Sequence, residues 1–540
     1  MNIKNESTKE INSTLFAAAD ILRGKMDANE YKTYILSVIF YKFLSDKMLE
    51  QVADLLDFEE GWTLADVQQG YEDILISENK EDFLKALKNK THYVIEPELT
   101  YTKLVDNVSH NKFQREDLQK AFAAIEHSDK IFVGMFKDVD LYSTRLGVNP
   151  QQQSNTIADL ILKLNEANVL GHDGDLLGDA YEYLIGQFAS ETGKKAGEFY
   201  TPKPVSQVLS RIALLGQEDR PNLAVYDPAM GSGSLLLQAK HIVNPNVVSL
   251  IKYYGQELMP TTYNLAKMNM FLHGIEPEKQ ILRNGDTLSD DWPSGMDNNF
   301  DAVMMNPPYS ANWSATQGFI TDPRFSSYGV LAPKSKADYA FLLHGYYHLK
   351  DGGTMAIVLP HGVLFRGAAE GKIRQKLLEN GSIYAVIGLP ANLFFNTSIP
   401  TCIVVLKKAR TGDNARDVLF IDASQEFVKG KKQNTLSQEN IEKIISTYKD
   451  RKDVEKYAHL ASFNEIEEND FNLNIPRYIN TFEEEPEVDL SALKAEMVDI
   501  QKNIKSNTSE LISMMNDLTS SDPKVREDIQ GLIQIFEEDK

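Results

Sequence analysis

The chain has 540 residues, of which 42% are hydrophobic and 25% are charged, a composition typical of a globular protein with two or three domains. Acidic residues outnumber basic ones by 78 to 56, so the formal net charge is −22, which argues against a protein that grips nucleic acid phosphates without help. The single cysteine, Cys402, excludes an internal disulfide and a cysteine-cluster zinc site.

Residues 1–165 are predicted to form a mostly helical domain with no evident catalytic residues. Apolar residues recur at helical spacing from about residue 15 to 55, and the runs at 77–90 and 114–127 continue this pattern. The most apolar run, YILSVIFYKFL (34–44), is interrupted by Lys42 and is too short to span a bilayer. The first residues contain no apolar run typical of a signal peptide, so we expect a cytoplasmic protein with no membrane partner.

From about residue 224, strand-like and helix-like runs alternate. Seven short β-rich runs begin with LAVYD (223–227) and end with TCIVVLKK (401–408). Helical stretches between them are predicted at 261–273, 338–349 and 367–379. This alternation predicts a parallel sheet that is covered by helices on both faces. Ligands of such sheets bind at the carboxyl ends of the strands.

The first two strands end in residues that suit a cationic, ribose-bearing ligand. In YDPAMGSGSLL (226–236), a strand, a loop and a helix follow one another, so we expect the N–H groups of Met230 to Gly233 to face a ligand, with Gly231 allowing close approach. Asp227 would repel a pyrophosphate but suits an ammonium group, and Glu257 can accept both hydroxyls of a ribose. S-adenosylmethionine carries both groups and fits better than a dinucleotide.

The next two strand ends suggest how an amine could be methylated. Asp286, after the third strand, could accept a hydrogen bond from an adenine amino group. The fourth strand ends in NPPY (306–309), whose prolines fix the backbone. If the Asn306 side-chain oxygen and the Pro307 carbonyl each accept one N–H of an exocyclic amine, the lone pair of its nitrogen is aimed at a methyl donor. Tyr309 offers a ring on which a planar substrate can stack.

Other polar residues are given structural interpretations. His273, His344 and His361 lack metal-ligand spacing, so we interpret them as ordinary core or surface histidines and expect no metal site. KGKK (429–432) is interpreted as a solvated loop, with a phosphate contact as the less favoured alternative.

Residues 481–540 are predicted to form a helical arm. They include 15 acidic and 6 basic residues, so we do not expect this segment to bind DNA phosphates. Pro523 is expected to end its helix, and two interpretations stay open: a helix packed on its own domain, or a coiled-coil-like arm for another subunit. Eight apolar residues fall on a heptad register that is interrupted only by Asn507, namely Leu490, Leu493, Met497, Ile500, Ile504, Leu511, Met514 and Leu518.

Five motifs together resemble a known family. GEFYTPKPV (197–205), DPAMGSGSLL, YGQEL, NGDTL and NPPYS, in this order, resemble the N6-adenine DNA methyltransferases, and specifically the modification subunit (HsdM) of type I restriction-modification systems. The runs at 20–47 and 176–202 resemble the helical domain of that family and its junction with the catalytic domain. The resemblance implies a multidomain chain with a helical N-terminal domain (1–165), a Rossmann-like, seven-stranded methyltransferase domain (166–480) and a C-terminal helical arm (481–540).

The resemblance also implies site residues and partners. S-adenosylmethionine would be the methyl donor, and a flipped adenine of double-stranded DNA the acceptor. NLFFNTS (392–398) resembles a later motif whose aromatic ring packs on the base, and Phe394 and Phe395 both remain candidates. A separate specificity subunit would bind two modification subunits, and a restriction subunit would join for cleavage. The implied cofactor contacts are Glu198, Phe199, Tyr200, Thr201, Pro202 and Lys203, with Met230, Gly231, Ser232 and Gly233 at the methionine end and Glu257 at the ribose.

Two other functions are compatible with parts of the sequence. A protein glutamine N5-methyltransferase could use the same NPPY turn, because an amide nitrogen has the same delocalised lone pair, but the large helical domain and the arm argue against it. A catalytically inactive scaffold for a specificity subunit is disfavoured by the intact Asn306 and Tyr309.

Overall fold

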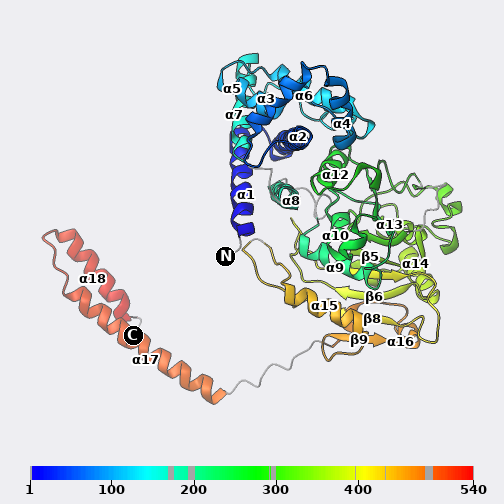
Figure 1. The fold of residues 1–540 in the computed structure, drawn as a ribbon. Coiled ribbons are helices and arrows are strands. Elements are labelled where there is room, and N and C mark those ends of the chain that lie inside the picture. The colour runs from blue at the N-terminus through cyan, green and yellow to red at the C-terminus, as the bar shows by residue number, and fades with distance from the viewer. Residues whose placement is uncertain are drawn as a thin grey trace. The chain divides into compact units, whose positions relative to one another are not determined.

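The computed structural model describes residues 3–167, 175–191, 201–290, 292–293, 300–395, 397–431, 433–480 and 490–538. The chain divides into two compact units, residues 1–480 and 481–540 (Figure 1). No helix within the described ranges combines the length and the apolar character that a bilayer crossing requires.

Residues 3–167 are helical, as predicted. In the last of their helices, α7, the Asn149 side chain accepts the N–H of Gln152 (2.9 Å) and Pro150 takes the first helical position, so the helix begins at this point. These helices share one hydrophobic core with α8 (Asp175–Glu191) and with part of α12 (Pro260–Leu272). The α-helices of this part are α1 (Ile3–Leu22), α2 (Ala28–Leu55), α3 (Leu64–Leu75), α4 (Lys80–Thr91), α5 (Tyr101–Ser109), α6 (Arg115–Ser128) and α7 (Pro150–Asn165).

A nine-stranded sheet in the order β3-β2-β1-β4-β5-β7-β6-β8-β9 lies at the centre of the second half of this unit. All seven predicted strand runs are strands, and β8 and β9 extend the expected seven-stranded sheet. The sheet is mixed rather than parallel, because β7 is antiparallel to β5 and β6, and β9 to β8. The strands are β1 (Ala224–Asp227), β2 (Lys252–Glu257), β3 (Gln280–Asn284), β4 (Phe300–Met305), β5 (Leu349–Pro360), β6 (Ile383–Gly388), β7 (Thr401–Lys407), β8 (Val418–Asp422) and β9 (Ala458–Ala461).

Helices cover both faces of the sheet. Along β5, Ala356 and Val358 belong to one core, and Met355 and Ile357 belong to the other, because successive side chains of a strand point to opposite faces. Burial on both faces explains why these strands read as continuous apolar runs. One face is covered by α9 (Lys203–Leu214), α10 (Ser234–Ile242), α12 and α15 (Gln438–Asp450), and the other by α13 (Asp338–Tyr347), α14 (Ala368–Glu379) and α16 (Phe463–Glu468).

Helix α12 joins the helical part to the sheet. Leu265 and Met268 belong to the core of the helical part, whereas Ala266 and Met270 belong to the core on the sheet. Figure 1 shows α12 between the N-terminal helices and the strands. The remaining short elements are α11 (Pro245–Val248) and the 3-10 helices Pro97–Leu99, Lys130–Phe132, Pro277–Lys279, Gln317–Thr321, Ser326–Tyr328, His361–Leu364 and Ile475–Arg477.

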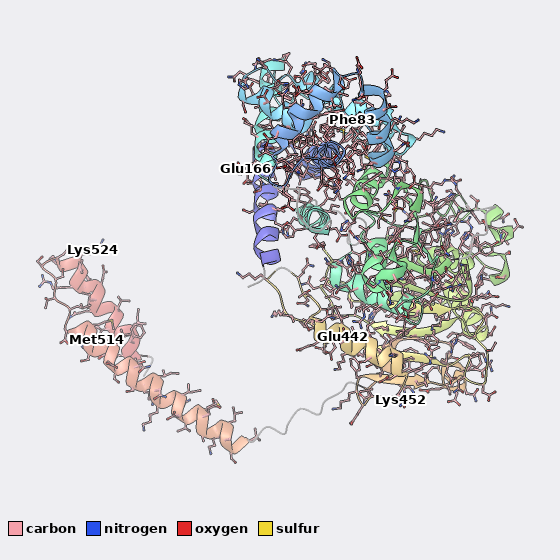
Figure 2. The ribbon with its side chains drawn as sticks, viewed as in Figure 1. Phe83, Glu166, Glu442, Lys452, Met514 and Lys524 are labelled. Atoms are coloured by element: carbon pink, nitrogen blue, oxygen red, sulfur yellow. The ribbon has the colours of Figure 1, made fainter. Side chains whose placement is uncertain are left out.

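The second unit is a pair of helices, α17 (Leu490–Asn516) and α18 (Pro523–Glu538), which pack on each other (Figure 1). Pro523 begins α18 instead of ending α17, which corrects the prediction, because proline is favoured in the first turn of a helix. Ile512 of α17 is buried, whereas the eight residues of the predicted heptad stripe are 40–73% exposed. Figure 2 labels one of them, Met514, and Lys524 at the start of α18.

Candidate active site

The carboxyl ends of neighbouring strands meet at a cavity of about 450 Å³. The sheet order places β3, β2, β1 and β4 side by side, so the residues that follow each strand are brought together. The cavity is lined by Glu257 at the end of β2, by Asp286 after β3, and by Asn306 and Pro308 after β4. The residues predicted at the ends of the second, third and fourth strands therefore share one site, and Pro228 and Ala229 line it from the loop after β1. We call it the first cavity.

The loop after β1 is closed by its own hydrogen bonds. Met230 donates its N–H to the Gln256 carbonyl (3.0 Å), Gly231 to Glu257 Oε2 (3.1 Å) and Gly233 to the Met230 carbonyl (2.8 Å). The expectation that these N–H groups face a ligand is therefore wrong for three of the four, because the loop folds back on β2. A loop without a row of free amides is poorly suited to a phosphate.

The two carboxylates of the cavity wall are held in place by other groups. Glu257 accepts the N–H of Met259 at Oε1 (2.7 Å) in addition to that of Gly231 at Oε2. Asp286 accepts the N–H of Leu288 at Oδ1 (3.0 Å) and the hydroxyl of Ser289 at Oδ2 (2.6 Å). Each carboxylate oxygen can accept a further hydrogen bond, so both side chains are oriented and still able to bind a donor.

Two buried polar groups lie in the cavity wall or next to its lining residue Pro228. Asp227 is 2% exposed, and burial, together with the negative charge of Glu257, raises its pKa to about 8 even though the carboxylate accepts the N–H of Ala229. Gln256 lines the cavity and is fully buried, and neither atom of its amide group has a hydrogen-bond partner among the residues that the structure describes. Because buried polar groups are ordinarily paired, this cavity suits a polar ligand with at least one cationic group.

Asn306 and Tyr309, which follow β4, are hydrogen-bonded to each other through their side chains. Tyr309 donates its O–H to Asn306 Oδ1 (2.6 Å), and Asn306 Nδ2 donates to Thr201 Oγ1 (3.1 Å). Burial raises the pKa of Tyr309 well above its ordinary value, so the phenol keeps its proton and remains a donor. The two bonds fix the orientation of the Asn306 amide. Thr201, which the resemblance implies as a cofactor contact, lies against this amide.

The backbone that follows the NPPY turn is held by a buried carboxylate. Ser310 donates its N–H to Asp338 Oδ1 (2.7 Å), and Asp338 is fully buried at the start of α13. Arg366 donates from Nη1 to Asp338 Oδ2 (3.3 Å) and to Glu370 (2.8 Å). Sequence reasoning missed Asp338, since a lone acidic residue at a helix start is common and carries no motif.

Residues 391–395, which we call the aromatic loop, lie beside Tyr309. The ring of Phe394 is 2% exposed and meets the Tyr309 ring edge-on, with centroids 6.1 Å apart. Phe395 is half-buried and lines a second cavity, of about 200 Å³. Pro202 and Lys203 border this second cavity, which shares no lining residue with the first. The two candidate phenylalanines therefore have different surroundings.

A buried arginine secures the loop that carries Asp286. Arg324 Nη1 donates to the Thr287 carbonyl (2.9 Å) and to His344 Nδ1 (3.1 Å), and Nη2 donates to Asp322 Oδ2 (2.7 Å). Burial lowers the pKa of His344 well below its ordinary value, so the imidazole is neutral and accepts at Nδ1. Sequence reasoning missed Arg324, because its role depends on contacts between distant segments.

The remaining predicted residues either make contacts within the fold or lie outside the described ranges. Glu198, Phe199 and Tyr200 are not among the described residues. His361, which is half-buried, bonds through Nε2 to the Thr401 carbonyl (3.0 Å).

His273 belongs to a small cluster with Asp179 and Glu182, in which one possible ligand atom of each residue lies within 4.8 Å of the others. Lys203 donates from Nζ to Asp179 (2.8 Å) and already supplies a positive charge there, so we assign no metal to the cluster.

Comparisons with known proteins agree with this geometry. The HsdM N-terminal domain family matches residues 11–164, and the N-6 DNA Methylase family matches residues 172–487. The methylase subunit of the type I restriction enzyme MpnII from Mycoplasma pneumoniae is 36% identical over 537 residues, covering 94% of this chain and 97% of the relative. The MjaVIII methylase subunit from Methanocaldococcus jannaschii is 32% identical over 515 residues, covering 92% of this chain and 82% of the relative.

Solved structures are similar over most of the chain. The crystal structure of the type I restriction-modification system methyltransferase subunit from Streptococcus thermophilus is 56% identical, with a TM-score of 0.85, and the match covers 88% of this chain and all of that one. A chain from a study of complex assembly in a type I restriction-modification system is 18% identical, with a TM-score of 0.61 over 96% of this chain, and supports the fold alone.

Proposed function

The chain belongs to the methylase (HsdM) subunits of type I restriction-modification systems, which methylate N6 of adenine in DNA, and from this premise we propose how its residues bind cofactor, base and partners. The first cavity binds S-adenosylmethionine, and the NPPY turn binds the target adenine. One observation carries this proposal: Asn306 lines the same cavity as Glu257 and Asp286, and its amide is held in one orientation by Tyr309.

The residues around the first cavity fit S-adenosylmethionine. When bound, this cofactor supplies a methyl group on a positively charged sulfonium. Asp227 accepts the ammonium group, Glu257 the ribose hydroxyls and Asp286 the adenine amino group. The buried amide of Gln256, which has no partner within the described part of the chain, and the carboxyl of Asp227 support a ligand that is both cationic and rich in hydrogen-bonding groups. The implied contacts of Glu198 to Lys203 and of Met230 to Gly233 are part of this proposal, but without the N–H groups of Met230, Gly231 and Gly233, which are already paired.

Residues of the NPPY turn position the amine of the target base. Asn306 Oδ1 and the Pro307 carbonyl each accept one N–H of the amine, which turns its lone pair toward the methyl group. Asn306 is uncharged, so it orients the amine and stabilises developing positive charge rather than acting as a base. Tyr309 stacks on one face of the flipped adenine. Phe395 covers the other face, because its ring lines an open cavity, whereas Phe394 is packed in the core.

Other subunits supply the recognition of the target sequence and the cleavage of DNA. A specificity subunit reads the target sequence and binds two modification subunits, and a restriction subunit joins for cleavage. Double-stranded DNA with a flipped adenine is the substrate, and the complex works in the cytoplasm. The net charge of −22 and the exposed apolar stripe of α17 support this division of labour, because such a stripe is suited to packing against another helix.

Mapping of N6-methyladenine in genomic DNA tests the proposed function. Cells would carry this chain alone, a specificity subunit alone, or both. We expect methylation of one recognition sequence only when both chains are present. Absence of N6-methyladenine in all three strains, or methylation of glutamine in a protein instead, would overturn the assignment.

A further inference from the structure

A basic hairpin lies next to the aromatic loop. Val428 and Thr435 exchange both of their backbone hydrogen bonds, at 2.8 and 3.0 Å, so that residues 428–431 and 433–435 form the two arms of a hairpin, which we call the 428–435 hairpin. Its tip includes Lys429 and Lys431, both exposed. At Gly430, a Cβ atom would lie 2.1 Å from the carbonyl oxygen of Gln433, so only glycine allows this tight tip.

The hairpin is fastened to the aromatic loop by three hydrogen bonds. Asn434 donates its N–H to the carbonyl of Asn392 (2.8 Å) and its Nδ2 to the carbonyl of Ala391 (2.9 Å). Gln433 donates from Nε2 to the carbonyl of Leu393 (3.1 Å). A loop whose only role is to be solvated does not need such anchoring. The bonds keep the two lysines at a fixed place relative to Phe395.

The hairpin borders the second cavity and not the first. Asn306 is bonded to Thr201, and the next residue, Pro202, lines the second cavity together with Phe395. Hairpin residues 433–435 line that second cavity, and none of them lines the first. A methyl group is transferred in line, so the target base must approach from the side opposite the donor sulfur. A base that reaches Asn306 through the second cavity would bring its strand past the hairpin.

The charge of the hairpin is not used within the fold. Neither Lys429 nor Lys431 takes part in an ion pair among the residues that the structure describes. By contrast, the neighbouring Lys443 pairs with Glu426, and Lys203 pairs with Asp179. In a chain of net charge −22, two exposed and unpaired ammonium groups beside the site form a local attraction for an anionic strand.

We propose that the 428–435 hairpin binds backbone phosphates of the target DNA strand next to the flipped adenine, through Lys429 and Lys431. This inference rests on the proposed function and adds a DNA contact that belongs to the modification subunit itself. Because the hairpin is hydrogen-bonded to the aromatic loop, the same contact fixes the position of the DNA strand relative to Phe395.

Salt-dependent binding of DNA to the complex with the specificity subunit tests this proposal. The double variant Lys429→Gln/Lys431→Gln is compared with the control Lys449→Gln/Lys452→Gln, which removes the same charge elsewhere. The control lysines flank Arg451, which donates to the carbonyl of Tyr384 at the start of β6, at the edge of the sheet opposite the strand ends that form the site. Figure 2 labels Lys452. Fluorescence anisotropy of a labelled duplex is measured at several salt concentrations, together with S-adenosylmethionine binding by calorimetry and methyl transfer at saturating duplex.

We expect the hairpin variant to weaken DNA binding and to reduce the slope of log K against log salt by about 1.8 for each modification subunit, because two phosphate contacts are lost. Cofactor binding should stay within about twofold of wild type, because neither lysine lines the first cavity, and the control variant should bind DNA normally. An unchanged slope, or an equal loss in the control, would overturn the proposal while leaving the proposed function intact. If the wild-type complex transfers no methyl group to the duplex, the proposed function fails instead.

Discussion

At the residue scale, the protonation of Asp227 links cofactor binding to pH. Its pKa of about 8 means that the carboxyl is mostly protonated in the unliganded protein at pH 7, whereas an ammonium group favours the carboxylate. Binding of S-adenosylmethionine at pH 7 should therefore release about one proton, and the affinity should rise as the pH increases from 6 toward 8. Calorimetry in buffers of different ionisation enthalpy measures this release. Identical heats in all buffers would contradict it, and Asp227→Asn should abolish it.

Glu257 offers a second test of the cofactor site. Glu257→Ala leaves the ribose hydroxyls without a charged acceptor and should weaken S-adenosylmethionine binding by about 1.5–3 kcal/mol. Part of this loss would come from the loop after β1, since Gly231 and Met259 also bond to this carboxylate. Glu257→Gln keeps one oxygen acceptor, so its affinity for S-adenosylmethionine should lie between those of the wild type and Glu257→Ala. Calorimetric affinities equal to wild type for both variants would mean that the ribose is bound elsewhere.

At the element scale, the segment around Arg324 stabilises the loop that carries Asp286. Arg324 is 2% exposed and joins the residues after the NPPY turn to this loop through carbonyl and carboxylate acceptors. Arg324→Gln removes the charged partner of Asp322 and the donor to the Thr287 carbonyl, and should destabilise the protein by about 1–3 kcal/mol. It should also weaken cofactor binding. Thermal denaturation with and without S-adenosylmethionine checks both effects, and a melting temperature no lower than that of the exposed control Arg477→Gln would refute this role.

The elements that sequence reasoning predicted correctly are those whose pattern is set by burial alone. Strands β1, β4, β5, β6 and β7 are mostly buried and read as apolar runs, and the helical spacing of residues 15–55 reflects one large core. What it missed depends on contacts between distant segments. The closure of the loop after β1 requires the Glu257 carboxylate, and the difference between Phe394 and Phe395 appears only once the aromatic loop is packed against Tyr309.

At the scale of the whole molecule, the separate helical unit predicts how the complex assembles. Because residues 481–540 form their own compact unit, a chain truncated before Leu490 should still fold and bind S-adenosylmethionine but should fail to co-purify with the specificity subunit. A triple variant, Leu493→Glu/Ile500→Glu/Ile504→Glu, should lose assembly as well, whereas Lys494→Glu/Lys502→Glu leaves the stripe intact and should assemble. Recovery of the complex with the truncated chain would show that the arm is not the docking element.

The account depends most on one residue, because Asn306 joins the first cavity to the target base. Asn306→Ala removes one of the two acceptors of the amine and should lower the single-turnover rate of methyl transfer by about 10²- to 10³-fold. Its affinity for S-adenosylmethionine, measured by calorimetry on the same preparation, should be largely unchanged, and the exposed control Asn380→Ala should behave as wild type. A near-normal transfer rate in Asn306→Ala would contradict the account.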